Sequence, residues 1–72
     1  MEPNETGIER AIRWAGTQNL LAEHLRAAGD RTVTQSRVSD WFVRGYVPRK
    51  RARLVSRITG VEFEDLLRKK LA

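Results

Sequence analysis

Short polar side chains and two arginines occupy residues 35–44, in a spacing that could place them against the edges of nucleic-acid bases. In a helix, where each residue turns the chain by about 100°, one side of this stretch carries Ser36, Ser39, Asp40 and Val43, and Gln35 lies nearer its start. Glutamine can form two hydrogen bonds with adenine, serine can bond most base edges, and a small apolar side chain can contact the methyl group of thymine. Arg37 and Arg44 share one shoulder of the helix, from which guanidinium groups can hold phosphates. These residues predict a helix that enters the major groove of DNA, although an ordinary amphipathic surface helix would show the same pattern.

A run of basic residues begins at the end of this helix. It consists of Arg44, Arg49, Lys50, Arg51, Arg53 and Arg57. Cations near the N-terminus of a helix oppose its dipole, so a sequence that places them there has another use for the charge. Contact with phosphates is the obvious use, and a solvated charged face is the alternative. For Asp40 we expect an ion pair with Arg37 or Arg44, although its carboxylate could also accept a hydrogen bond from cytosine.

The charge of the chain is unevenly distributed. Residues 1–36 hold four basic and five acidic side chains, whereas residues 37–72 hold ten basic and four acidic ones. Positive charge gathered in one half of a small domain indicates a polyanionic partner. The chain has no cysteine and no apolar run near the ~20 residues of a membrane span, and its polar N-terminus does not resemble a signal peptide. We therefore expect a single domain of 72 residues, located in the cytoplasm and without a membrane partner.

Glycines and capping residues divide the chain into helices. Glycine follows a helical stretch at positions 16, 29, 45 and 60, where a left-handed residue commonly ends a helix. Thr6 and Glu9 have the spacing of a capping box, and Thr17 and Thr34 are suited to be N-caps. The expected helices span residues 7–15, 18–28, 35–44, 49–59 and 62–70. The predicted fold class is all-α, a compact bundle of five short helices in which residues 30–33 form a loop, an extended segment or a continuation of the second helix.

Apolar residues recur at helical spacing and define the expected core. In the helix over 35–44 they are Val38, Trp41 and Phe42. The other helices contribute Ile8, Ala11, Ile12, Ala15, Leu21, Leu25, Ala28, Leu54, Val55, Ile58, Phe63, Leu66, Leu67 and Leu71. Trp14 falls off the apolar stripe of the first helix, so we expect it at the edge of the core or in a dimer contact.

No residue pattern indicates catalysis or a bound cofactor. His24 is the only histidine and has no cysteine to accompany it, so we expect no metal site. The chain contains no recognisable nucleophile motif and no glycine-rich phosphate loop. We therefore expect no enzyme, no cofactor and no small-molecule substrate.

Four segments carry a family resemblance. They are QNLLA at 18–22, VSDW at 38–41, RGYVP at 44–48, and 54–67 with ITGV in its middle. In this order they resemble the Cro/repressor-like helix-turn-helix family, which includes phage Cro and CII proteins and YdaS-type antitoxins, over about residues 8–68. In that family a short turn follows the alanine of the first motif. Here Val38 lies 16 residues after Ala22, which predicts a lengthened turn or a longer first helix of the motif.

The resemblance implies a transcriptional regulator, a repressor of a phage or mobile element, that inserts the helix over 35–44 into the major groove. It implies that Gln18 holds a phosphate at the start of the first helix of the motif, where backbone N–H groups also attract anions, and that Thr34 caps the recognition helix. With the start of the basic run, the expected DNA-binding residues are Gln18, Thr34, Gln35, Ser36, Arg37, Ser39, Asp40, Val43, Arg44, Arg49, Lys50 and Arg51.

The expected partners are double-stranded DNA and a second copy of the chain. A homodimer would bind a pseudo-palindromic operator with half-sites roughly 34 Å apart, and the C-terminal stretch FEDLLRKKLA, with Leu71, is the candidate dimer surface. Two other interpretations remain. The string WFVRGYVPRKR also resembles the helix-to-wing boundary of excisionases and MerR-type proteins, but a wing needs strands after Pro48, where we expect a helix. The chain could also be an antitoxin or adaptor whose basic face meets an acidic protein.

Overall fold

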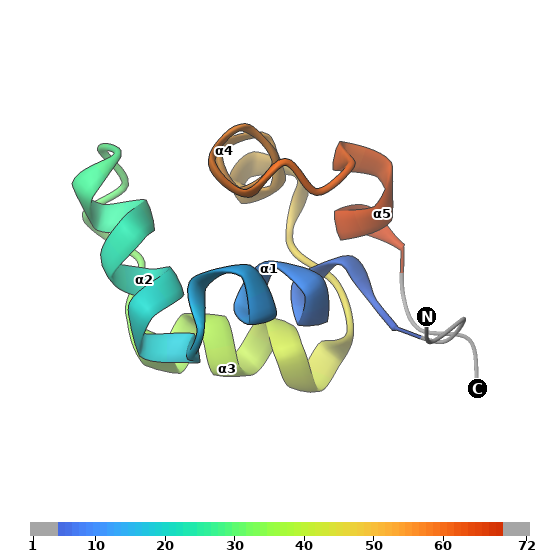
Figure 1. Ribbon diagram of the computed structural model, residues 1–72, viewed down its shortest axis with the longest axis horizontal. Coiled ribbons are helices and arrows are strands. Elements are labelled where there is room, and N and C mark those ends of the chain that lie inside the picture. The colour runs from blue at the N-terminus through green and yellow to red at the C-terminus, as the bar shows by residue number, and fades with distance from the viewer. Residues whose placement is uncertain (1–4, 69–72) are drawn as a thin grey trace.

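Five α-helices and no strands make up residues 5–68, the part of the chain that the computed structural model describes (Figure 1). The helices are α1 (Gly7–Ala15), α2 (Gln18–Ala27), α3 (Gln35–Arg44), α4 (Arg49–Thr59) and α5 (Phe63–Leu67). The all-α class is confirmed, and α1, α3 and α4 have the bounds that the sequence predicts. None of the described helices combines the length and the apolar character that a membrane crossing requires.

Local side-chain caps set the starts of the first two helices. The hydroxyl of Thr6 accepts a hydrogen bond from the backbone N–H of Glu9, and the carboxylate of Glu9 accepts one from the N–H of Thr6, which confirms the capping box. The hydroxyl of Thr17 accepts from the N–H of Leu20 at 3.1 Å. These bonds satisfy donors that have no partner inside the helix, so the sequence specifies both starts locally.

Two helices end earlier than predicted. Helix α2 ends at Ala27 rather than at 28, because Ala28 is its cap and Gly29 follows with φ +120°. Helix α5 begins at Phe63 and ends at Leu67, because Arg68 takes extended torsion angles, φ −79° and ψ 129°. Residues 69 and 70 of the predicted fifth helix, and the candidate dimer residue Leu71, lie outside the described residues.

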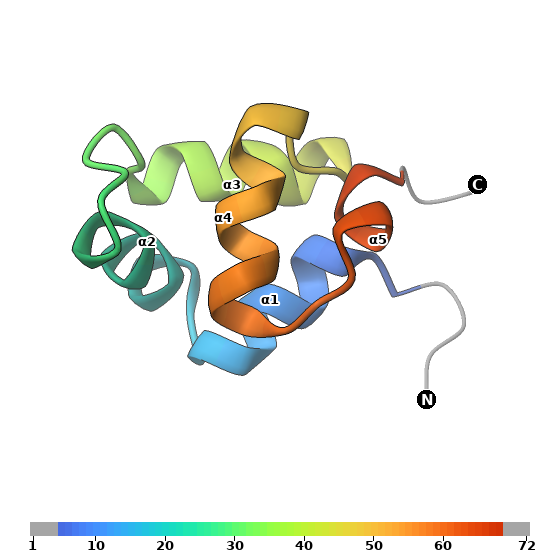
Figure 2. The same ribbon diagram turned by 90° about the horizontal axis from the view of Figure 1, so that it is seen from above.

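Helix α1 is the centre of the arrangement. It packs against each of the other four helices, with α3 on one side and α4 on the other. Figure 2 shows α4 crossing over α1, while α2 and α5 lie at opposite ends of the molecule. Within residues 5–68, α3 and α4 do not pack against each other, and only the loop 45–48 joins them.

The core follows the predicted helical stripes and adds residues from two loops. The fully buried helical residues are Ile8, Ala11, Leu21, Ala22, Val38, Ala52, Val55 and Leu66, with Leu25 and Trp41 almost so. Val33 and Val47 are also fully buried, although each lies in a connection rather than in a helix. The N–H of Val47 donates to the carbonyl of Leu66 at 2.8 Å, so the loop before α4 is attached to α5.

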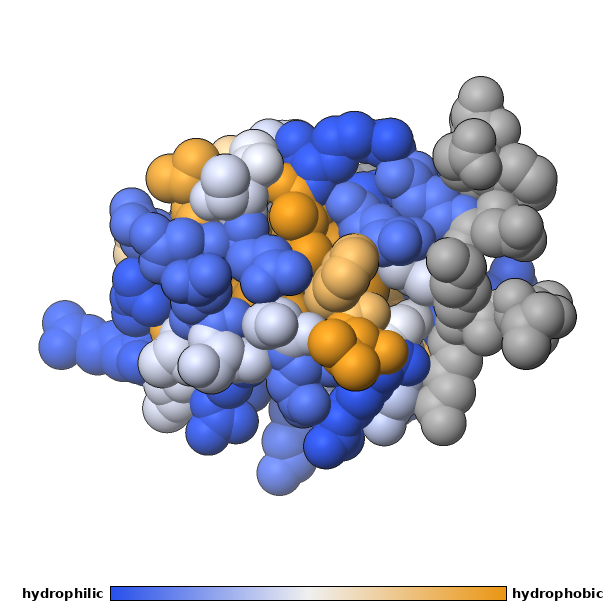
Figure 3. Space-filling view, turned by 90° about the horizontal axis from the view of Figure 1, so that it is seen from below, coloured by the Kyte–Doolittle hydropathy of each residue, from blue (hydrophilic) through white to orange (hydrophobic). Residues whose placement is uncertain are grey.

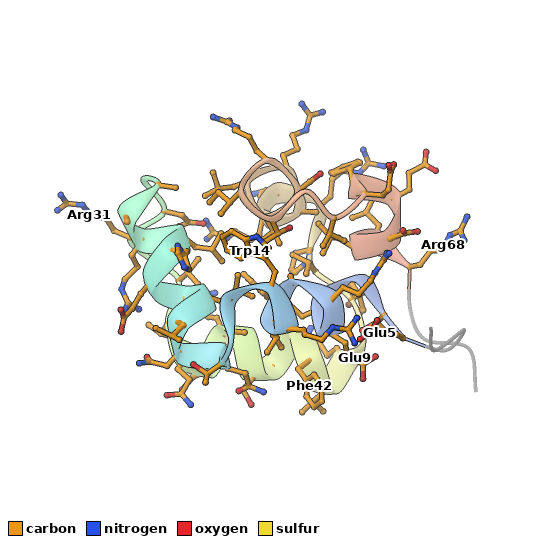
Figure 4. All side chains as sticks on the ribbon, in the orientation of Figure 1. Glu5, Glu9, Trp14, Arg31, Phe42 and Arg68 are labelled. Carbon is orange, nitrogen blue, oxygen red and sulfur yellow. The ribbon has the colours of Figure 1, made fainter. Side chains whose placement is uncertain are left out.

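Two residues that the sequence predicts in the core, Phe42 and Ala28, are exposed. Phe42 is 43% exposed, because the buried stripe of α3 is narrow and consists of Val38, Trp41 and the following Gly45. Figure 4 shows the ring of Phe42 pointing away from the other helices. Ala28 is exposed because α2 has already ended there.

Candidate nucleic-acid interface

A seven-residue connection, 28–34, separates α2 from α3 and sets where α3 begins. This confirms the lengthened turn. Thr34 ends the connection in extended conformation, and its hydroxyl accepts a hydrogen bond from the N–H of Arg37 at 3.3 Å. Thr34, one of the predicted site residues, is therefore the N-cap of α3.

Side chains from α2 and α4 hold this connection in place. Arg26 of α2 donates from Nη1 to the carbonyl of Val33 at 2.9 Å. The carboxylate of Asp30 accepts hydrogen bonds from the N–H and the hydroxyl of Thr32, at 3.3 and 2.7 Å, and from Arg51 of α4 at 2.6 Å. The long connection is thus attached to α2 through Arg26 and to α4 through Arg51.

The same contacts change the acidity of Asp30. Burial raises its pKa, but the hydrogen bonds from Thr32 and the positive charge of Arg51 act together in the opposite direction. The net effect holds the pKa of Asp30 below its ordinary value. The carboxylate is therefore ionised at neutral pH, and its ion pair with Arg51 is present at that pH.

Helix α3 presents the predicted polar side outward, and we call this side the α3 face. It consists of Gln35, Ser36, Ser39, Asp40 and Val43, all exposed except the partly buried Ser39. On the other side of the helix, Val38 and Trp41 are buried in the core. Figure 3 views the molecule from the side on which α3 lies, and it shows a mostly hydrophilic surface with a connected apolar area across its middle.

Asp40 forms the ion pair expected of it, and its partner is Arg44. Their charged groups lie 3.1 Å apart, one turn along the helix, with both side chains more than half exposed. A hydrogen bond to Tyr46, and then the charge of Asp40, raise the pKa of Arg44. Arg37, by contrast, is exposed and forms no ion pair with any residue between 5 and 68. Its charge remains available to an external anion.

Some of the basic residues of α4 make contacts within the protein, and others are exposed to solvent. Arg51 is paired with Asp30, and the guanidinium groups of Arg49 and Arg53 lie 5.6 and 5.9 Å from the ring centroid of Phe63. Such cation–π contacts supply a structural reason for cations at this helix start. Lys50 and Arg57 are exposed and make no ion pair with a described residue.

The predicted site residues do not all share one surface. The α3 face, Arg37 and Arg44 belong to one helix, and Gln18 lies in the first turn of α2, which packs against α3. Helix α4 lies on the opposite side of α1 (Figure 1). Arg49 is only five residues from Arg44, a span of at most about 17 Å. This span limits how far the start of α4 can lie from the end of α3, but the two helices do not pack against each other.

The site that the sequence predicts leaves out one exposed cation of the 28–34 connection. Arg31 is exposed in the connection that precedes the helix, and Figure 4 shows its side chain projecting from the molecule at the end where α2 lies. It forms no ion pair with any other residue that the structure describes. The signal that could have found it is a basic residue inside a long turn before a candidate recognition helix.

An exposed aromatic pair lies away from this surface. Trp14, near the end of α1, is 48% exposed, and its ring centroid is 4.8 Å from that of His24 on α2. The two rings are tilted by 56°. This contact joins α1 and α2, and Trp14 is not among the partly buried residues that pack against the core.

Comparisons of this chain with protein families, with curated protein sequences and with solved structures found no match. Its function must therefore be inferred from its own residues and their geometry.

Proposed function

We propose that this chain is a sequence-specific, double-stranded DNA-binding regulator that inserts α3 into the major groove. The observation that carries the proposal is the division of α3 into two sides. Val38 and Trp41 anchor one side in the core, while the other side exposes hydrogen-bonding side chains and a valine. A helix held rigidly by its buried side, with short groups on its outer side, can approach base edges closely.

The charges around α3 support the same proposal. Arg37, on α3 itself, is exposed and has no ion-pair partner among residues 5–68, so it can neutralise a phosphate beside the helix. Arg31 and Lys50 are also exposed and unpaired within those residues, but they lie in the 28–34 connection and in α4. The chain carries a formal net charge of +5 at pH 7. Positive charge steers a protein toward DNA and supplies much of the affinity for it. Gln18, in the first turn of α2, would add a phosphate contact where the helix dipole favours anions.

The resemblance to the Cro/repressor-like helix-turn-helix family supports the finer parts of the proposal. These are action as a repressor of a phage or mobile element in the cytoplasm, and binding as a homodimer to a pseudo-palindromic operator. The excisionase interpretation has less support, because residues 49–59 form α4 and a wing would need strands there. The adaptor interpretation remains the second candidate, and the observation that favours it is the exposure of Phe42 and Val43, at 43% and 78%.

Binding to DNA from upstream of the chain's own gene tests the proposal. A labelled duplex of that sequence is compared with a scrambled duplex at several salt concentrations. We expect the native duplex to bind more tightly, and log affinity to fall against log salt with a slope of about −0.9 for each phosphate contacted. The variants Gln35→Ala and Ser39→Ala should reduce the preference for the native duplex by roughly 1–3 kcal/mol each.

A matched control distinguishes the loss of a contact with a base from the general effect of replacing a partly buried helical serine. Ser56 is a partly buried serine in α4, as Ser39 is in α3, so Ser56→Ala should leave the preference unchanged. Equal binding to both duplexes, or no binding to either, would contradict the proposal. In that case an acidic protein partner becomes the leading hypothesis, and Phe42 and Val43 are the residues to substitute first.

A further inference from the structure

Neither packing in the core nor helix stability explains why a valine occupies position 43. It lies in the last turn of α3 and is 78% exposed, more than Trp14, Leu20 or Phe42. A β-branched residue loses side-chain freedom in a helix, so valine is a weak choice for an exposed helical position. A partner outside the domain would give this side chain a contact that residues 5–68 do not give it.

The neighbours of Val43 limit what that contact can be. Side chains three, four and seven residues earlier share its side of the helix, and these are Asp40, Ser39 and Ser36. Most of the surface on this side of the molecule is hydrophilic, with a connected apolar area across its middle (Figure 3). The exposed cation on the same helix that has no ion-pair partner among residues 5–68, Arg37, suits a polyanion better than an apolar protein surface.

The two ends of the α3 face offer different chemistry. Gln35 and Ser36 at the first turn present hydrogen-bonding groups. At the last turn, the guanidinium of Arg44 lies 3.1 Å from the carboxylate of Asp40 and is hydrogen-bonded to Tyr46, so a guanine would compete with these two partners for it. The carboxylate of Asp40 also repels the O6 and N7 acceptors of guanine. What remains at this end is the pair of methyl groups of Val43.

We infer that Val43 contacts the 5-methyl group of a thymine, and that the recognised sequence requires this thymine at the base step facing the last turn of α3. The thymine methyl is the apolar group that base pairs display in the major groove. The inference rests on the proposed function and names the base that one residue of the site selects.

The test uses a duplex recovered by selection from a random-sequence library with the full chain. Each thymine in the recovered site is replaced in turn by deoxyuridine, which lacks only the 5-methyl group. We expect one replacement to weaken binding about fourfold, the effect of returning one methyl group to water. Deoxyuridine in the flanks of the site is the control and should change nothing.

The variant Val43→Ala then identifies the residue responsible. Because Val43 is exposed and alanine is the better helix former, the variant should keep the helicity of the parent and melt at the same or a slightly higher temperature, as circular dichroism would show. It should bind the thymine duplex more weakly, and it should bind the thymine and deoxyuridine duplexes equally. A variant that keeps the full fourfold sensitivity, or a parent chain insensitive to every replacement, overturns the inference and leaves the proposed function standing. A library that yields no preferred sequence overturns the proposed function and the inference with it.

Discussion

The carboxylate of Asp30 lies 2.6 Å from the guanidinium of Arg51, and this ion pair joins the connection before α3 to the first turn of α4. The side chain of Asp30 is only 12% exposed, and it also accepts two hydrogen bonds from Thr32. The pair therefore helps to fix the position of α3 relative to a helix that α3 does not touch.

Replacing Asp30 by alanine should destabilise the protein, because several donors lose their acceptor at once. We expect the free energy of unfolding to fall by about 1–3 kcal/mol, measured by urea denaturation. Glu23 on α2 is an exposed carboxylate that accepts one hydrogen bond from Asn19 at 3.2 Å. Glu23→Ala is the matched control, with an expected change within about 0.5 kcal/mol. Equal effects of the two substitutions would show that the contacts of Asp30 add no stability.

The stability that Asp30 contributes should depend on pH. The pKa of Asp30 is below its ordinary value in the folded protein, so the folded state favours the ionised form more than the unfolded chain does. This contribution is fully present above the unfolded pKa of about 4 and is lost as the pH falls through the folded pKa. We expect the difference in unfolding free energy between the parent and Asp30→Asn to shrink from pH 6 to pH 2. A difference that stays constant over this interval would argue against a lowered pKa.

Gly7 is needed because α5 passes directly over the start of α1. A Cβ at position 7 would lie 2.7 Å from both the carbonyl carbon and the carbonyl oxygen of Asp65. Helix propensity alone predicts that Gly7→Ala stabilises the protein by about 1 kcal/mol. The clash with backbone predicts the opposite, a loss of about 1–3 kcal/mol. A thermal melt decides between them, and a raised melting temperature would show that α5 moves away from α1 at little cost.

The elements that the sequence predicts well are those whose causes are local. The capping box of Thr6 and Glu9, and the hydroxyl caps Thr17 and Thr34, act within three residues of their own position. Apolar residues at helical spacing identified Ile8, Leu21 and most other buried residues of the helices, but not Ala22 or Ala52. Local bonding and periodicity were therefore enough for the fold class and for most helix bounds.

The features that the sequence did not predict depend on contacts between distant segments. Val33 and Val47 are buried because neighbouring helices cover their loops, which no periodicity reveals. Arg51 looked like a phosphate ligand, but its nearest acidic partner is 21 residues earlier in the chain. Phe42 looked like a core residue because it adjoins Trp41, yet only one of the two can fill the narrow space beneath α3.

Thr34 allows the capping of α3 to be separated from its approach to DNA. Thr34→Ala removes the hydroxyl that accepts from Arg37, so it should cost about 1 kcal/mol of stability, as Thr17→Ala should for α2. Thr34→Asn and Thr34→Asp both restore a cap acceptor and should keep the stability of the parent. If the start of α3 lies among phosphates, the aspartate should also weaken DNA binding about fivefold relative to the asparagine, since like charges a few ångströms apart repel by about 1 kcal/mol even in water. Equal DNA affinity of these two variants at low salt would place the start of α3 away from the DNA backbone and would contradict insertion of α3 into the major groove.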